Sequence, residues 1–272
     1  MNNHFFNFFL EASKDLVPKH SVINLRGQNT DVDTSTVPET VTGLGSIYEF
    51  ITYDTSAPNN GAQYLKVSST STDDTFSGSG AMRVLLEGLD ENFKQISEVV
   101  PMNGTGSVST AQRFLRLNSI VLDCAGSGEK NVGTIAVVNS AAASHTLGTI
   151  RPGEGKMHQA VFTVPANHSA YILEIQGSMS RSSAAGVAIL SLITREPKQR
   201  TTLSGFFGEN MVRLTHHSLS LQDDGNRIFN KLFALPIKVP QLSDILVDCT
   251  YVSANNTSVN ADLSIILVND GE

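Results

Sequence analysis

Hydrophobic and polar residues alternate along most of this chain, and the pattern is clearest in the stretch 80–105. There the apolar Val84 and Leu86 alternate with the polar Arg83 and Glu87. Successive side chains of a strand point to opposite faces, so a period of two predicts a β-strand and argues against a helix. Such a strand buries one face and exposes the other.

A second strand follows after a short polar segment. Residues 88–92 read Gly-Leu-Asp-Glu-Asn and combine a glycine, which adopts positive φ readily, with side chains that bond their own backbone. The apolar members of the strand after this turn are Phe93, Ile96, Val99 and Val100. We therefore predict an exposed antiparallel hairpin, in which no residue pattern indicates an active site.

Comparable short strands, separated by turn residues, recur from Ser46 to the C-terminus. The sequence Arg-Pro-Gly-Glu-Gly at 151–155 interrupts the series. This organisation predicts an all-β fold with two antiparallel β-sandwich domains, over residues 46–150 and 151–272. The second domain is expected to be jelly-roll-like, because it offers about eight strands.

The alternation near the C-terminus predicts which residues of the second domain share one face of a strand. Ile245, Val247, Cys249 and Tyr251 are separated by single residues and would share one face of a strand. The intervening residues, which include Asp248, would lie on the opposite face.

Residues 1–45 lack sustained alternation, and we predict an extended N-terminal arm there. The first residues of this arm are rich in phenylalanine, so they would present a bulky apolar surface that needs a partner. Two interpretations stay open from the sequence: the arm binds another protein, or it packs on its own body. The residues expected to contact a partner are Phe5, Phe6, Phe8, Phe9, Leu10, Leu25 and Arg26.

Composition narrows the functional classes. Hydrophobic residues make up 40% of the 272 residues and charged residues only 17%, a mixture that suits strands joined by polar turns. The net charge of −7 and the scattered Lys and Arg argue against nucleic-acid binding. No run approaches the roughly twenty apolar residues of a membrane span. Cys124 and Cys249 fall in different predicted domains, so we expect two reduced, buried thiols and no disulfide.

The sequence offers only weak candidates for chemistry. Asp31 and Asp33, and the run 223–226 (Asp-Asp-Gly-Asn), could ligate a cation, but each lacks the further ligands of a metal site, and solvated segments are the favoured interpretation. His216 and His217 are adjacent, so in a strand they would face opposite ways and could not share a metal. No nucleophile elbow, phosphate loop or zinc motif is present. We predict no catalytic, cofactor-binding or metal-binding residues.

Several stretches resemble a family of structural proteins from tailed bacteriophages, especially marine ones. They are GAMRVLLEGLDENFKQISEVVPMNGT, RFLRLNSIVLDCAGSGEKNVGTIAV, AYILEIQGSMSR, LRGQNTDVDT and the ending ALPIKVPQLSDILVDCTYVSANNTSVNADLSIILVND. The resemblance implies a virion component, made in the host cytoplasm, with no enzymatic role. It further implies a homo-oligomer that decorates or cements the capsid or occupies its vertices, with the N-terminal arm bound to the major capsid protein or another virion protein.

Other functions compete with this one. A neck, tail or fibre-base subunit would need the same attributes. A module that binds host glycans or a receptor is a further alternative, although a chain with no Trp and five Tyr supplies few stacking platforms. A glycan hydrolase would need two carboxylates facing one cleft, for which Asp223, Asp224 and Asp248 are available.

Overall fold

The computed structural model of this chain divides into two units. Among the residues that the structure describes, one unit comprises three segments, within 1–47, 159–197 and 211–271, and the other lies within Tyr48–His158. We name them the jelly-roll unit, for the topology given below, and the inserted unit. The structure describes Glu11 and residues 17–54, 56–140, 145–180, 186–197, 211–222 and 228–271.

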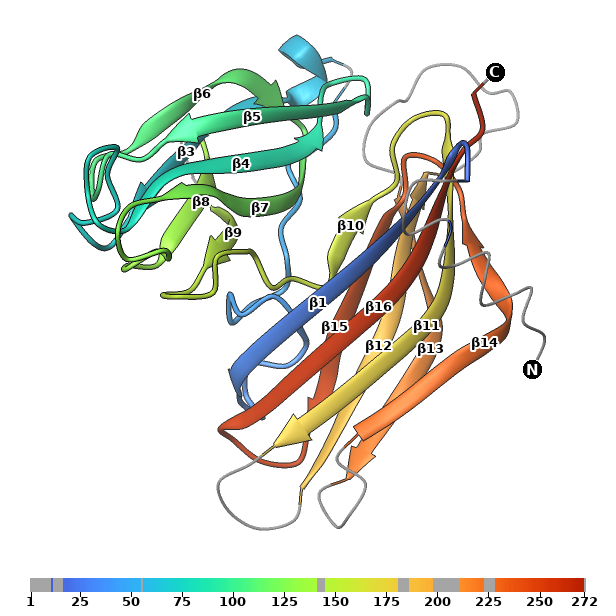
Figure 1. The fold of residues 1–272 in the computed structure, drawn as a ribbon. Helices are drawn as coiled ribbons and strands as arrows, with labels where there is room; N and C mark the ends of the chain where they lie inside the picture. The colour runs from blue at the N-terminus through green and yellow to red at the C-terminus, as the bar shows by residue number, and fades with distance from the viewer. Residues whose placement is uncertain are drawn as a thin grey trace. The chain divides into compact units, whose positions relative to one another are not determined.

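The jelly-roll unit consists of two antiparallel sheets. The first, sheet A, has the strand order β1-β16-β11-β14, and the second, sheet B, has the order β10-β15-β12-β13, with the short β2 also paired to β15 (Figure 1). When β1 and β10 to β16 are numbered one to eight along the chain, these orders become 1-8-3-6 and 2-7-4-5, which is a jelly roll of two Greek keys. The strands are β1 (His20–Val32), β2 (Glu39–Thr40), β10 (Val161–Thr163), β11 (His168–Ser180), β12 (Val187–Pro197), β13 (Met211–Gln222), β14 (Ile228–Val239), β15 (Asp244–Val252) and β16 (Thr257–Asn269).

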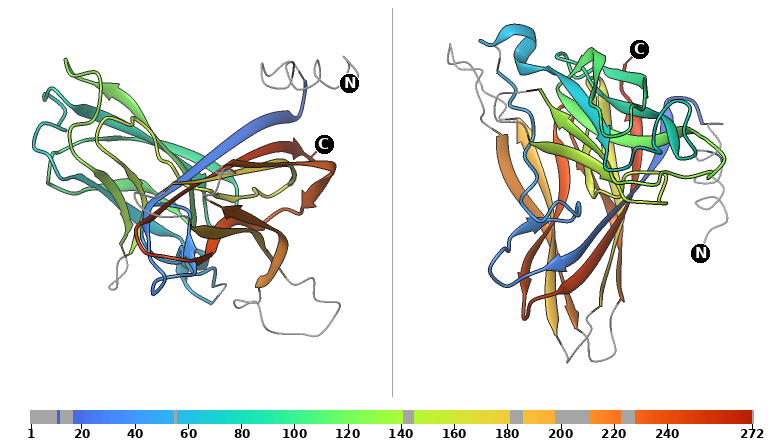
Figure 2. Two further views of the ribbon diagram at one scale, coloured as in Figure 1. Left: turned by 90° about the horizontal axis from the view of Figure 1, so that it is seen from below. Right: turned by 90° about the vertical axis from the view of Figure 1, so that its left-hand side faces the viewer.

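Strand β1 corrects the prediction of a separate arm over residues 1–45. It pairs with β16 from His20 opposite Val268 to Val32 opposite Thr257, and the two strands lie side by side in every view (Figure 2). Leu25 belongs to the hydrophobic core. Within the described residues this part of the chain therefore packs on its own body. One face of β1 carries the buried Leu25 and Asn29, and the exposed Arg26 lies on the opposite face.

The shared face predicted for Ile245, Val247, Cys249 and Tyr251 in β15 is right up to Cys249 and wrong beyond it. Ile245, Val247 and Cys249 are buried in the core between the sheets. Tyr251 is instead 47% exposed, and Val252 takes the core position. The cause is a register shift against β12, since an irregularity of one residue reverses the faces of all residues that follow it.

The inserted unit is a smaller sandwich of a four-stranded sheet, β6-β3-β8-β9, and a three-stranded sheet, β5-β4-β7. The predicted hairpin is confirmed: β4 and β5 pair antiparallel, and Val84 and Leu86 are fully buried. Asp90 closes its turn, because the Oδ1 atom accepts hydrogen bonds from the amides of Asn92 (2.8 Å) and Lys94 (2.9 Å). The elements are η1 (Pro58–Gly61), β3 (Gln63–Ser69), β4 (Ala81–Leu89), β5 (Gln95–Pro101), β6 (Val108–Phe114), β7 (Arg116–Ala125), β8 (Ile135–Asn139) and β9 (Thr146–Ile150).

The boundary between the units falls after His158 and not after residue 150. Backbone hydrogen bonds explain the difference. The Leu122 amide donates to the Gly155 carbonyl (2.7 Å), and the Met157 amide donates to the Ile120 carbonyl (2.8 Å). The segment after β9 therefore runs along β7 before the chain enters the jelly-roll unit, and the predicted Pro-Gly boundary is a turn within the inserted unit.

Both cysteines are free: Cys249 is buried, as predicted, and Cys124 is half-buried. No helix in the described part of the chain has the length and apolarity that crossing a membrane requires.

Candidate functional site

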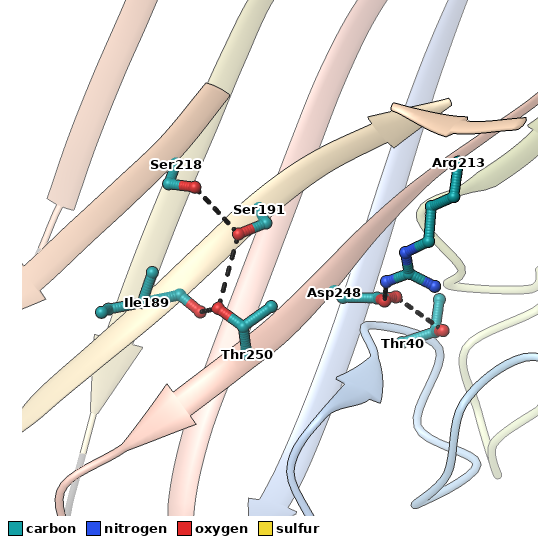
Figure 3. A network of polar contacts seen from close by, with 7 residues as sticks. All are labelled: Thr40, Ile189, Ser191, Arg213, Ser218, Asp248 and Thr250. Carbon is teal, nitrogen blue, oxygen red and sulfur yellow. Dashed lines mark hydrogen bonds and ion pairs between the residues drawn. The ribbon is translucent and has the colours of Figure 1, made fainter. Parts of the chain in front are cut away.

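Two fully buried carboxylates lie on the face of β15 that is turned away from the core. Asp244 and Asp248 are four residues apart on one strand and alternate with core residues, so both point to this face. Arg213 of β13 forms an ion pair with Asp248 (Figure 3). Arg195 of β12 places Nη1 3.5 Å from Oδ2 of Asp244. Each buried carboxylate therefore has a cationic partner on another strand of sheet B: Arg195 on the adjacent β12 and Arg213 on β13, one strand further away.

A threonine completes the surroundings of each carboxylate. The Thr40 hydroxyl donates to Oδ1 of Asp248 (2.8 Å), and the Thr163 hydroxyl donates to Oδ1 of Asp244 (2.7 Å). A buried charge is tolerated when it is both paired and hydrogen-bonded, and these two meet that condition. The arrangement ties β2, β10, β12 and β13 to β15, which is a structural role.

A row of hydroxyl groups runs across the same sheet. Ser191 Oγ lies 3.0 Å from Ser218 Oγ and 3.4 Å from Thr250 Oγ1, and the Thr250 hydroxyl donates to the Ile189 carbonyl (3.3 Å) (Figure 3). A serine or threonine nucleophile needs a base within hydrogen-bond reach. The partners drawn for these hydroxyls are other hydroxyls and a carbonyl, so the row has no activated nucleophile.

The residues Thr194, His216 and Glu196 resemble a catalytic triad but do not have its geometry. Nε2 of His216 lies 2.8 Å from the Thr194 hydroxyl and 3.9 Å from Oε1 of Glu196. Thr194 also donates to the same Oε1 atom (3.0 Å). A relay needs the hydroxyl on one ring nitrogen and the carboxylate on the other. Here both groups meet the same nitrogen, and Thr194 is fully buried.

Of the three carboxylates suggested for glycan hydrolysis, the structure describes one, Asp248. Asp248 is fully buried and bound to Arg213, so it faces no cleft. Asp223 and Asp224 lie outside the described residues, as does the rest of the run 223–226.

Asp33 and the two adjacent histidines each have a partner within the protein. Oδ1 of Asp33 accepts a hydrogen bond from the Asn256 amide (2.9 Å), which joins the residue after β1 to the turn between β15 and β16. The His217 ring packs at right angles against Phe233, with centroids 5.9 Å apart, while His216 binds Thr194 as described. Among the described residues, no group of three or more His, Cys, Asp or Glu side chains could hold a metal ion.

The sequence reasoning missed a buried carboxylate in the inserted unit. Asp74 is fully buried and accepts four hydrogen bonds. Burial raises the pKa of this carboxyl group, but the hydrogen bonds, from the Ser69 hydroxyl first, lower it by more, so the pKa lies below its ordinary value. The donors are Ser69 Oγ (2.6 Å) and the amides of Ala81 (2.7 Å), Val132 (2.9 Å) and Gly133 (2.8 Å).

Asp74 thus joins the loop after β3 to the start of β4 and to the segment before β8. The adjacent Asp73 is exposed. The surrounding Ser, Thr and Gly residues indicate a turn in the sequence, but nothing in the sequence distinguishes the buried aspartate from the exposed one.

The residues expected to contact a partner divide into three groups. Phe5, Phe6, Phe8, Phe9 and Leu10 lie outside the described residues. Leu25 is in the core and is unavailable to a partner. Arg26 is on the outer face of β1, with 59% of its side chain exposed, and its Nε atom lies 3.9 Å from Asp262.

Comparison with known proteins gives no family assignment. No family model matches the chain, and no curated protein matches it. A crystal structure of the infectious bursal disease virus VP2 subviral particle is 12% identical and aligns with 100% of this chain and 79% of its own, with a TM-score of 0.20. A structure of T=1 particles derived from the same virus is 10% identical over 92% and 78%, with a TM-score of 0.12. Both TM-scores lie below 0.5, so the fold assignment rests on the strand order alone.

Proposed function

We propose that this chain is a non-enzymatic structural protein of a tailed-phage virion that decorates or cements the capsid or occupies its vertices. The observation that carries the proposal is the strand order of the jelly-roll unit, with the inserted unit between β2 and β10. Jelly rolls recur in viral capsid proteins and in lectins, so this step is an analogy at the level of fold.

The described polar clusters favour a structural role over an enzymatic one. The carboxylates of sheet B are buried in ion pairs, the hydroxyl row has no base, and the Thr194–His216–Glu196 set has the wrong geometry for a relay. The resemblance of the sequence to phage structural proteins then favours a virion component over a lectin.

Attachment to the particle is assigned to the Phe-rich residues that precede β1. These residues include five large apolar side chains within positions 5–10. A segment that becomes ordered on binding can bury such side chains against the major capsid protein. The part of the predicted arm that forms β1 has no share in this attachment.

The copy number per particle tests the proposal. We expect the chain in purified virions, counted by quantitative mass spectrometry against the major capsid protein, at hundreds of copies for a lattice decoration or a few tens for vertices. A dozen copies or fewer would contradict capsid decoration and favour a neck or tail position.

Deletion of residues 1–16 tests the attachment. Because β1 remains intact, the truncated chain should fold and give the same thermal unfolding transition as the full chain, but it should no longer be found on particles. Replacement of the four phenylalanines by serine in the full chain is a second test, which keeps the length of the segment, and it should also abolish attachment. Full incorporation of either variant would refute this role of the segment.

A further inference from the structure

Strand β14 carries most of the strongly exposed apolar surface of the described residues. Three of the four most exposed large hydrophobic side chains lie on it: Leu235 (86%), Ile228 (71%) and Leu232 (61%). Phe229 and Phe233 of the same strand pack against the core, so Ile228 and Leu232 point to the opposite face of the sheet. An apolar stripe of this kind on a polar sheet face is typical of an interaction surface.

The strand is also the last one in sheet A. Its pairing partner is β11, and no strand of the described residues pairs with its other edge (Figure 1). From Ile228 to Leu232 the pairing with β11 is regular, from Ser178 opposite Ile228 to Glu174 opposite Leu232. Beyond Leu232 the register shifts, with four residues of β14 opposite one of β11. A regular five-residue edge is therefore available for a further strand.

A second copy of β14 fits this edge. Around a twofold axis perpendicular to the sheet, an antiparallel copy must place outer-face residues opposite outer-face residues. With Asn230 opposite itself, Ile228 lies opposite Leu232 of the second copy, and Leu232 lies opposite its Ile228. Lys231 then lies opposite Phe229. Both apolar side chains are paired, and no like charges meet.

The neighbouring registers are worse. A shift that centres the axis on Lys231 places two lysines opposite each other, and like charges at that position are destabilising. A shift that centres it on Phe229 places Ile228 opposite Asn230 and leaves Leu232 without an apolar partner among the described residues. A shift to Leu232 moves the contact into the irregular residues that follow it, including Pro236, which has no amide to donate.

We infer that two copies of this protein associate through β14, in the register that places Asn230 opposite itself, so that sheet A continues across the twofold axis from one copy into the other. The inference concerns the jelly-roll unit alone and does not depend on the position of the protein in a particle.

Cysteine cross-linking of the purified chain tests the register. Cα atoms of opposed residues in an antiparallel pair are about 4.5–5.5 Å apart, which a disulfide spans. In a Cys124→Ser background, Asn230→Cys should give a disulfide-linked dimer under mild oxidation, reversed by a reductant. Lys231→Cys should give far less, because its opposite residue is Phe229. Lys66→Cys, an exposed position on the central strand β3, measures the background from random collision.

A substitution of Leu232 tests the proposed contact between Ile228 of one copy and Leu232 of the other. In the Asn230→Cys chain, Leu232→Lys should abolish the cross-linked dimer and lower the mass measured by sedimentation, without changing the far-ultraviolet circular dichroism. Leu214→Lys makes the same change on β13, which precedes β14 in the sequence and belongs to sheet B, at a side chain that is 39% exposed, and it should leave the dimer intact. Cross-linking of Asn230→Cys at the background level would overturn the inference, as would stronger cross-linking of Lys231→Cys or a dimer that survives Leu232→Lys.

Discussion

The Asp74→Asn substitution tests the interpretation of the buried carboxylate in the inserted unit. The Asp74 side chain is fully buried, and each of its two oxygens accepts two hydrogen bonds. Asparagine has nearly the same shape, so the change leaves no cavity. Its NH2 group replaces one acceptor oxygen, and whichever way the amide turns, that group meets two donors.

The magnitude follows from these contacts. If the NH2 group takes the place of Oδ1, the amides of Ala81 and Val132 both lose their acceptor. If it replaces Oδ2, the Gly133 amide loses its acceptor, while the Ser69 hydroxyl can rotate. The amide takes the less costly of these two orientations, which leaves the Gly133 amide as the one unsatisfied donor. At about 1–3 kcal/mol for a buried donor left unsatisfied, the free energy of unfolding of the inserted unit should fall by about 1–3 kcal/mol.

The effect should depend on pH in a defined direction. The pKa of Asp74 is lowered in the folded state relative to about 3.9 in the unfolded chain. The stabilisation by the ionised group is therefore fully present above about pH 4 and is lost as the pH falls through the folded-state pKa. The difference between the wild type and Asp74→Asn should be largest near neutral pH and should shrink as the pH falls below about 4.

Urea denaturation followed by circular dichroism measures the loss. Asp73→Asn is the matched control, because it makes the same charge change at the adjacent exposed aspartate and should alter stability by less than about 0.5 kcal/mol. If the two variants have equal midpoints at pH 7, Asp74 does not organise its loops in the way described here.

Three further predictions concern the jelly-roll unit. Arg213→Ala should lower the free energy of unfolding by about 1–2 kcal/mol, because it leaves the buried Asp248 without its cationic partner; the loss is moderate since solvent already screens the partly exposed arginine. Arg26→Ala, at the exposed pair with Asp262, is the control and should lower the free energy of unfolding by less than about 0.5 kcal/mol. Burial raises the pKa of Cys249 to about 12, so iodoacetamide at pH 8 should label Cys124 and spare Cys249 until the protein unfolds. Peptide mass spectrometry measures the labelling of each cysteine, and equal labelling rates at the two cysteines in the folded protein would contradict the burial of Cys249. Gly27→Ala should lower the thermal midpoint and cost about 2–3 kcal/mol, since the added methyl group would lie 2.2 Å from the Val41 carbonyl oxygen, and an unchanged midpoint would refute that close approach.

The sequence predicts individual β-strands better than it predicts which strands pair with one another. Period-two alternation was sufficient to find the β4–β5 hairpin and the buried face of β15 as far as Cys249, because both follow from local geometry. It failed at β1, where His20 pairs with Val268 and the apolar face is visible only once that partner is known. The bulge that exposes Tyr251 has no sequence signal of the glycine kind, so the reversal of faces could not be predicted.

The insertion of one unit into the other explains why residues 1–45 resemble an arm in the sequence. The inserted unit begins after Ile47 and ends at His158, and residues of the jelly-roll unit near both ends are adjacent. The Ala160 amide donates to the Val41 carbonyl (3.0 Å), and both residues lie against Gly27 of β1. A whole domain can be inserted where the two ends of the interruption are close together, at little cost to the fold that receives it. In sequence, however, the insertion separates β1 from the other long strands of its sheet by about the length of a typical domain. A strand isolated in this way has the polar, irregular appearance of a linker, although its register with β16 makes it an integral part of sheet A.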